Sequence, residues 1–289
     1  MHPTNRIDWH ADALQQDLGH LWPGLRVQVL ASVDSTSTRL LEECRAQPAS
    51  EFIATLLVAE HQSRGRGRSG RAWHSASGAS LTFSLAVVLQ REDWSGLSLA
   101  VGAALADALD APGEADSAAP RLMLKWPNDL WLHGRKLGGV LIETVSGGAQ
   151  RIAVIGIGLN VLPLTVPDAS SGVACLRELD PGMSAPHALR RVAAPLLRAL
   201  RSFERSGFSA FEPCYQARDL LRGRDVVAGA LHGVAMGIAP SGALRLRCDD
   251  GPLAPVREIV SGEVSVRLLA PPHTPALAGF DTAAPTAAC

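Results

Sequence analysis

The chain has 289 residues, 47% of them hydrophobic, and a formal net charge of −1 at pH 7. This size allows one large domain or two unequal ones with a packed core, and the balanced charge argues against a general nucleic-acid-binding protein. No apolar run is long enough to span a bilayer, and the N-terminus has no apolar signal core. The five scattered cysteines, without a C-x-x-C spacing, indicate reduced thiols in the cytoplasm rather than a zinc site or disulfides.

Apolar periodicity predicts alternating helices and strands over the first 161 residues. Helices are expected at 8–22, 37–47 and 97–111, and strands at 26–37 (ending in a polar turn), 52–62, 79–89, 121–132, 135–145 and 151–161. A later helical pattern covers residues 187–206. It contains Pro195, which predicts a kink or a late start, and Gly207 can end it.

From about residue 222 the pattern changes to short strands at close intervals. Asp250 and Gly251 form a tight hairpin signal, so this part is expected to fold as a small β-barrel. The Pro- and Ala-rich end of the chain carries little charge and is expected to be disordered. We therefore predict an α/β domain at 1–220, a small β domain at 221–270 and a disordered tail at 271–289.

The segment RGRGRSGRAW (64–73) contains three glycines spaced G-x-G-x-x-G and four arginines within eight residues. A dinucleotide-binding turn needs a helix directly after the glycines, but a β-like run follows here, and the chain has no G-x-x-x-x-G-K-[ST] phosphate loop. Crowded arginines repel one another and glycines leave the backbone adaptable, so an anion is expected to order the loop. The alternative is a solvated basic turn.

Of the 27 Lys and Arg residues only two are lysines, Lys125 and Lys136, and both lie in KWPNDLWLHGRKLGG. Arginine occupies nearly every position where either residue would serve. The two remaining lysines therefore indicate positions that need a compact ammonium, which a planar guanidinium cannot replace. The alternative is that they are chance survivors.

Three further features are typical of a ligand site. Hydroxyl side chains cluster after a strand in VDSTST, although an ordinary polar turn also explains them. A glutamine ends the strand before the arginine-rich segment at 64–73. Glycines open or interrupt two later strands, which indicates either close approach to the backbone or tight strand packing. The residues concerned are Ser35, Thr36, Ser37, Gln62, Gly138, Gly156 and Gly158.

Together and in this order, the motifs resemble those of the biotin–protein ligases, also called biotin–[acetyl-CoA-carboxylase] ligases. The resemblance runs from about Val33 to Leu268, and GRGRSGR, KWPNDL and GRKLGGVLIE are its most specific parts. It implies an α/β catalytic domain on a mixed sheet of the biotin/lipoate ligase type, followed by an SH3-like β-barrel. It also implies two steps. The biotin carboxylate attacks the α-phosphate of ATP to give biotinyl-5′-adenylate, and a lysine of a biotin carboxyl carrier protein then attacks this mixed anhydride.

The resemblance also implies which residues bind biotin and ATP. Hydroxyl and amide side chains would sit at the biotin end, and a lysine and two glycines would line the pocket. These residues are Ser35, Thr36, Ser37, Gln62, Lys136, Gly138 and Gly158.

The catalytic roles fall on the basic motifs. Arg66 and Arg68, with Gly65 and Gly67, would close on the carboxylate and phosphate, and Lys125 would stabilise the α-phosphate as pyrophosphate leaves. Mg²⁺ would accompany ATP. The residues that would hold it or the phosphates are Asp129 and Asn160. The sequence contains no recognisable metal-ligand cluster or catalytic nucleophile.

Many relatives carry an N-terminal DNA-binding domain, but only 32 residues precede Val33 here, fewer than an independent domain needs. We therefore expect the enzyme-only form, a monomer or weak homodimer that binds neither nucleic acid nor membrane. Two alternatives stay open. One is a lipoate or octanoate ligase or transferase of the same fold, and the other is a biotin-sensing DNA-binding regulator.

Overall fold

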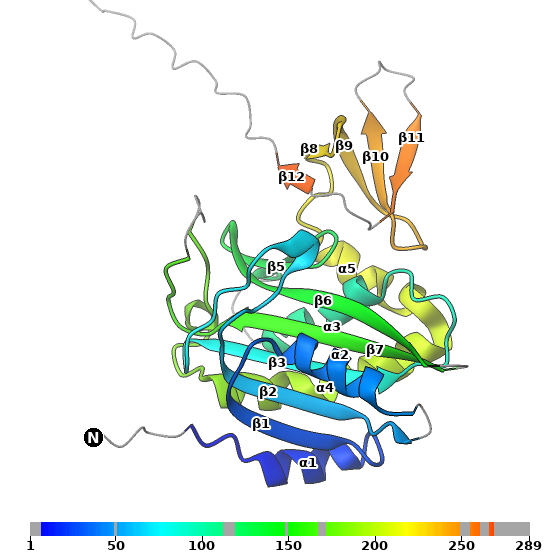
Figure 1. Ribbon diagram of the computed structural model, residues 1–289. Helices are drawn as coiled ribbons and strands as arrows, with labels where there is room; N and C mark the ends of the chain where they lie inside the picture. Colours follow the sequence, from blue (N-terminus) through cyan, green and yellow to red (C-terminus); the bar gives the residue numbers. More distant parts are fainter. Residues whose placement is uncertain are drawn as a thin grey trace, which may run out of the picture.

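The computed structural model describes residues 7–48, 51–111, 119–147, 150–166, 172–248, 255–260 and 266–268. Within them, a seven-stranded mixed sheet has the order β1-β2-β3-β7-β6-β5-β4, with β1 and β2 parallel and the other neighbours antiparallel (Figure 1). The strands are β1 (Arg26–Val33), β2 (Thr55–Gln62), β3 (Ser80–Val88), β4 (Leu122–Lys125), β5 (Asp129–Leu132), β6 (Arg135–Gly147) and β7 (Gln150–Asn160). The predicted mixed-sheet α/β fold is confirmed.

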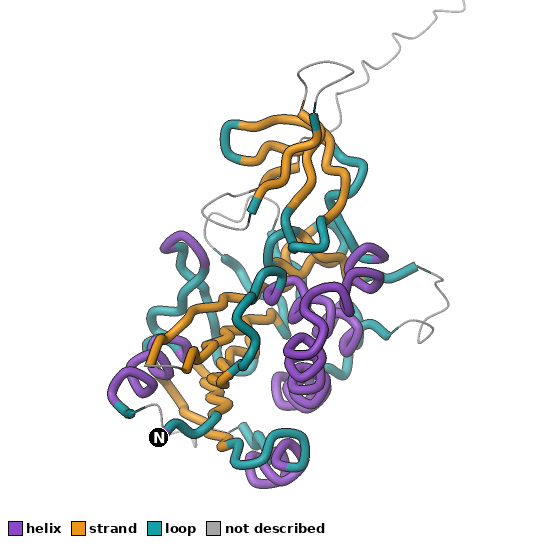
Figure 2. Tube along the Cα trace, turned by 90° about the vertical axis from the view of Figure 1, so that its right-hand side faces the viewer, coloured by secondary structure: helices purple, strands orange, loops and turns teal. Residues whose placement is uncertain are grey.

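Helices cover both faces of this sheet (Figure 2). On one face, Leu40 and Leu41 of α2 pack against Leu57 and Val154, while α1, α3 and α4 contribute to the larger core on the other face. No helix within the described ranges combines the length and apolarity needed to cross a membrane. The helices are α1 (Ala11–Gly19), α2 (Thr36–Ala46), α3 (Leu97–Leu109), α4 (Ala185–Ser206) and α5 (Glu212–Ala217), with 3-10 turns η2 (Arg68–Gly70), η3 (Leu176–Glu178) and η4 (Gly207–Phe211).

A second, five-stranded antiparallel sheet follows, in the order β11-β10-β9-β8-β12. Alternate residues of β10 are buried (Leu244, Leu246 and Cys248), as expected for a strand with one face in a core. The predicted hairpin at 250–251 and the tail at 271–289 lie outside the described residues. The strands are β8 (Asp225–Ala228), β9 (Leu231–Ile238), β10 (Leu244–Cys248), β11 (Val256–Ile259) and β12 (Val266–Leu268).

Several predicted elements differ in the structure. The polar turn predicted to end the strand at 26–37 is instead the start of α2, which begins at Thr36. The run at 121–132 is not one strand but a hairpin of β4 and β5, because Pro127 has no N–H and cannot continue a strand within a sheet. Of the two alternatives predicted for the helix around Pro195, a kink or a late start, the late start does not occur, since α4 begins at Ala185. Ser184 caps it by accepting from the backbone N–H of His187, and a buried apolar face stabilises the helix despite the proline.

Candidate active site

A cavity of about 170 Å³ lies between several segments of the larger domain. Its walls are the start of α2, the arginine loop at 64–73, the β4–β5 hairpin, and the glycine-bearing parts of β6 and β7. These segments are far apart in the chain. The sheet order brings them together, because β7 lies between β3 and β6.

One end of the cavity is a buried network of hydroxyl groups at the start of α2. Ser35 caps this helix by accepting a backbone N–H. Thr36 donates both its N–H and its Oγ1–H to Gln62 Oε1, at 2.8 and 3.1 Å. The hydroxyl of Ser84, on β3, lies 2.7 Å from Thr36 Oγ1 and 3.0 Å from Ser37 Oγ. Because the side chains are buried and linked, they present fixed polar groups to a ligand.

Two glycines of β7 leave room for neighbouring side chains. A Cβ at Gly156 would lie 2.4 Å from Ser37 Oγ, and a Cβ at Gly158 would lie 2.4 Å from Cε2 of Trp73. The Trp73 ring therefore lies against the strand backbone and forms a flat wall of the cavity. Its indole N–H is buried and has no hydrogen-bond partner within the part of the chain that the structure describes.

The arginine loop folds back on itself as a short hairpin. Gly67 N–H donates to Arg71 O at 2.7 Å, and Trp73 N–H donates to Gly65 O at 2.9 Å. A Cβ at Gly65 would lie 2.4 Å from Trp73 O, so the two sides of the hairpin could not approach this closely with a larger residue. The loop leads to β3 and not to a helix, so it is not a dinucleotide-binding turn.

Two arginines of the loop reach different partners. Arg66 donates to Glu143 Oε1 on β6 at 2.7 Å and to Thr38 Oγ1 on α2 at 3.3 Å. Arg68 donates to Asn128 Oδ1, in the turn between β4 and β5, at 3.5 Å. The loop is therefore tied to both sides of the cavity.

The end of the cavity beside the β4–β5 hairpin is cationic. Lys125 and Asp129 are opposite each other in the hairpin, and Lys136 Nζ lies 2.8 Å from Asp129 Oδ1. The ammonium of Lys125 also lies 4.6 Å from the centroid of the Trp131 ring, within cation–π range. Burial lowers the pKa of Lys125, while Asp129 opposes this shift and Lys136 adds to it. Burial likewise lowers the pKa of Arg68.

The cavity is positively charged, although the chain as a whole is nearly neutral. Among the described residues, its walls carry five cationic side chains, one of which (Arg66) pairs with Glu143, and one carboxylate, that of Asp129, whereas the chain has a net charge of −1. Such a concentration of positive charge in a recess attracts a ligand with several negative charges. Among the described residues, no group of three His, Cys, Asp or Glu side chains could hold a metal ion.

The structure brings most of the predicted site residues together. All of them line the cavity except Gly65, Gly138 and Asn160. Gly65 does not line the cavity, but it allows the two sides of the loop hairpin to approach each other. At Gly138 a Cβ would lie 2.5 Å from Gly158 O, so this glycine allows tight strand packing. The buried amide of Asn160 donates to Ala174 O at 3.1 Å, outside the cavity.

The site also contains features that were not predicted. Ser84 joins the hydroxyl network, and its sequence signal is the alternation of Ser80, Thr82 and Ser84 along an otherwise apolar strand. Trp73 closes the arginine motif in the sequence, but nothing in the pattern tells that its ring turns towards β7.

Two family models match the chain: the Biotin/lipoate A/B protein ligase family at residues 29–160, and the Biotin protein ligase C terminal domain at residues 223–267. The Bifunctional ligase/repressor BirA of Escherichia coli is 33% identical over 265 residues, which cover 88% of this chain and 77% of that protein. A biotin–[acetyl-CoA-carboxylase] ligase of Paracoccus denitrificans is 30% identical over 257 residues, which cover 81% of this chain and 100% of that protein.

Solved structures agree with these matches. The biotin protein ligase of Aquifex aeolicus in complex with biotin and ATP superposes with a TM-score of 0.68 and is 29% identical, covering 86% of this chain and 100% of that one. The family models cover strands of both sheets. The chain therefore belongs to the biotin/lipoate A/B protein ligase family, and within it to the biotin protein ligases.

Proposed function

We propose that the protein is a biotin–[acetyl-CoA-carboxylase] ligase, which activates biotin as biotinyl-5′-adenylate and transfers it to a lysine of a biotin carboxyl carrier protein. The observation that carries this proposal is a single cavity with two chemically different ends. Hydroxyls and an amide form one end, and an excess of cations forms the other. Biotin has the matching polarity, with a ureido ring at one end and a carboxylate at the other.

The hydroxyl network suits the ureido ring. This ring offers two N–H donors and one carbonyl acceptor, and the hydroxyls of Ser35 and Ser37, which line the cavity, can each donate or accept. The ring of Trp73 and the bare backbone of Gly158 supply an apolar surface for the rest of the molecule. A straight alkyl chain, as in octanoate, would leave the buried hydroxyls without ligand partners, so the network favours biotin over the lipoate or octanoate alternative.

Gly158→Ala is expected to weaken biotin binding by about tenfold or more, because the new methyl must displace the Trp73 ring from the wall. Isothermal titration with biotin measures the effect. Gly19→Ala is the matched control, since nothing lies within 4 Å of a Cβ there. Equal biotin affinity in the two variants would contradict a biotin site at Trp73 and Gly158.

The cationic end suits the adenylation step. A biotin carboxylate oxygen bonds to the α-phosphorus of ATP, the bond from this phosphorus to the bridging oxygen breaks, and pyrophosphate leaves. Carboxylate and triphosphate repel each other, so the site has to neutralise charge without offering a competing nucleophile. Protonated Lys125 and the guanidiniums of Arg66 and Arg68 meet this requirement.

In the transfer step, a neutral lysine amine of the carrier attacks the biotinyl carbonyl carbon. AMP leaves with the bonding electrons, and the nitrogen loses a proton. Until then the mixed anhydride has to be kept from water. The contacts from the arginine loop to β6 and to the β4–β5 turn support a role of this loop in covering it.

Mg²⁺ fits this site as part of the ATP substrate. Of the wall residues that the structure describes, Asp129 alone carries a carboxylate, and it is paired with Lys136. Magnesium is commonly bound by one or two carboxylates together with substrate phosphates. The ion would therefore arrive with ATP, where it screens the phosphate charge, and Asp129 is the residue that could contact it.

We propose that the enzyme works in the cytoplasm as a monomer or weak homodimer, without nucleic acid or membrane partners. The cysteines within the described ranges, Cys44, Cys175, Cys214 and Cys248, are free thiols, which fits a reducing compartment. The acceptor of biotin would be the carrier protein of acetyl-CoA carboxylase or of a related carboxylase.

Exchange of labelled pyrophosphate into ATP tests this function. We expect exchange with biotin but not with lipoate or octanoate, and transfer of biotin to one lysine of a purified carrier domain. Exchange that depends on lipoate or octanoate would instead favour the other ligases of this fold. Absence of exchange with every acid, combined with biotin-dependent binding to a promoter fragment, would favour the DNA-binding regulator.

A further inference from the structure

The segment between α5 and β8 (residues 218–224, the connecting segment) lies along the edge of β4 that faces away from β5. The N–H of Leu124 donates to Arg218 O at 2.7 Å, and the N–H of Leu220 donates to Leu124 O at 2.9 Å, so the segment pairs with β4 in parallel. Leu124 immediately precedes Lys125. On the other side of this lysine, the indole N–H of Trp126 donates to Gly242 O, in the turn between β9 and β10, at 3.0 Å. Both neighbours of Lys125 are therefore held by parts of the chain beyond α5.

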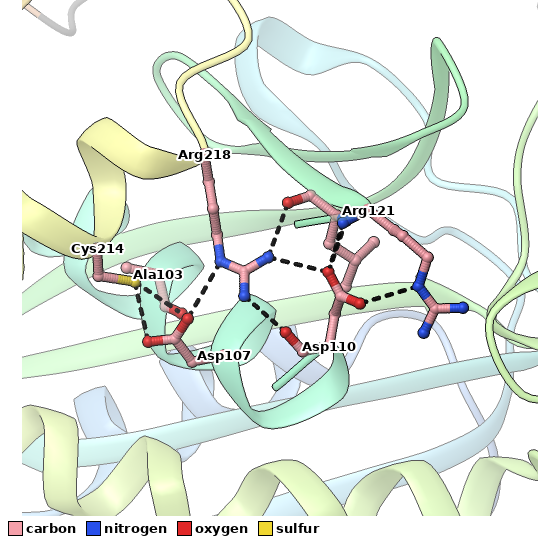
Figure 3. Close-up of polar contacts among 7 residues, drawn as sticks. Ala103, Asp107, Asp110, Arg121, Cys214 and Arg218 are labelled. Carbon is pink, nitrogen blue, oxygen red and sulfur yellow. Dashed lines mark hydrogen bonds and ion pairs between the residues drawn. The ribbon is translucent and has the colours of Figure 1, made fainter. Parts of the chain in front are cut away.

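The side chain of Arg218 fixes this pairing from within the core (Figure 3). It is 2% exposed, and its guanidinium lies between the end of α3 and the start of β4. It donates to Asp107 Oδ1 at 3.1 Å, to Asp110 Oδ2 at 3.0 Å, to Asp110 O at 2.6 Å and to Leu122 O at 3.0 Å. One rigid group thus joins a helix end, a strand and the connecting segment.

Asp110 completes this junction. It is the C-cap residue of α3, and its carboxylate accepts from the N–H groups of Arg121 and Leu122 at 2.8 and 2.9 Å, and from Arg121 Nε at 3.1 Å. Burial opposes ionisation of this carboxyl, but the hydrogen bonds from Leu122, Arg218 and Arg121 outweigh it and lower the pKa of Asp110. The ionised carboxylate therefore fixes the start of β4 relative to α3.

We propose that Arg218 is a positioning residue for adenylation: by joining α3, β4 and the connecting segment, it sets where β4 ends and so where the ammonium of Lys125 stands. The proposal rests on the role proposed above for Lys125. Arg218 itself acts through the backbone of β4. β4 has only four residues and is the last strand in the sheet order, so its position depends on these contacts, and a displacement of about 1 Å at a reacting group can cost roughly 100-fold in rate.

The test replaces Arg218 with methionine, which has a similar length but no hydrogen-bond donors. We expect Arg218→Met to lower kcat for biotin-dependent ATP–pyrophosphate exchange by roughly 10- to 100-fold. The KM for biotin should stay unchanged, because the hydroxyl end of the cavity is built by α2, β2 and β3. Arg191→Met is the matched control: Arg191 Nε donates to Ala108 O, near the same end of α3, from α4. We expect this variant to keep its exchange rate.

A double-mutant cycle distinguishes positioning from general destabilisation. If Arg218 acts through Lys125, Arg218→Met should cost nothing further in a Lys125→Ala background. An equal loss of kcat in both backgrounds, or no loss in either, overturns the proposal. Full exchange by Lys125→Ala alone would refute the role of Lys125, and with it this inference, while leaving biotin ligation itself intact.

A folding control is needed because the methionine removes the hydrogen bonds from Arg218 to the carboxylates of Asp107 and Asp110. Arg218→Lys keeps a charge at this place but cannot reach all four acceptors, so it should fold, bind biotin normally and still lose at least several-fold in kcat. Thermal unfolding and biotin titration verify that both variants are folded. A folded Arg218→Lys with the kcat of the unmodified protein contradicts positioning by the guanidinium.

Discussion

Lys125→Arg is expected to lose pyrophosphate exchange by about 100-fold or more, although the substitution keeps the charge. The ammonium of Lys125 sits 4.6 Å from the Trp131 ring centroid, opposite Asp129 in a tight hairpin. A guanidinium is longer, planar and wider, so it cannot occupy this place without moving the ring or the phosphate. The low lysine content of the chain agrees, since every Lys or Arg position other than Lys125 and Lys136 is an arginine.

Initial rates of biotin-dependent ATP–pyrophosphate exchange measure this loss. Arg245→Lys is the matched control, because it makes the reverse exchange on the exposed side of β10 and should change the rate by less than about twofold. Biotin affinity should be nearly unchanged in Lys125→Arg, since the hydroxyl network lies at the other end of the cavity. A rate close to that of the unmodified protein would exclude a point-charge role for Lys125.

Arg68→Gly is expected to release biotinyl-adenylate into solution and to biotinylate unrelated proteins. Arg68 extends from the arginine loop to Asn128 in the β4–β5 turn, so its side chain crosses the cavity between two of its walls. Its removal deletes this bridge and one cation beside the adenylate. The free mixed anhydride then acylates exposed amines wherever it meets them.

The same variant is expected to label itself weakly. The chain offers two lysines, and Lys136 is paired with Asp129 while Lys125 lies at the site. The N-terminal amine, with a pKa of about 7.7–8.0, is the other nucleophile. A lysine-rich bystander protein should therefore carry most of the label, with self-labelling confined to Met1 or Lys136.

Peptide mass spectrometry of the mixture reads both outcomes. The unmodified protein is the control and should leave the bystander unlabelled. Self-labelling as strong as that of the bystander would refute the argument from lysine content. An unlabelled bystander would refute the role of Arg68 in retaining the adenylate.

Local patterns predicted the helices and strands, the change to a small β domain and the site-like motifs, while the resemblance to the biotin–protein ligases supplied the mixed sheet and the roles of the site residues. The apolar runs of β3 and β7 and the amphipathic face of α4 follow from periodicity, because each strand or helix has to bury its apolar side chains. The crowded arginines at 64–73 and the rarity of lysine identified Arg66, Arg68 and Lys125 as candidate site residues from the sequence. Their motifs are local, and the structure brings them to one cavity.

The sequence did not reveal contacts between residues distant in the chain. The ring of Trp73 against Gly158, the hydroxyl of Ser84 beside Thr36 and the guanidinium of Arg218 under β4 all depend on which strands are neighbours. Asn160 looked like a site residue beside its glycines, but its amide is turned to Ala174. Periodicity shows which face of an element is buried, while strand order and register decide what that face meets, and these are set by packing of the whole chain.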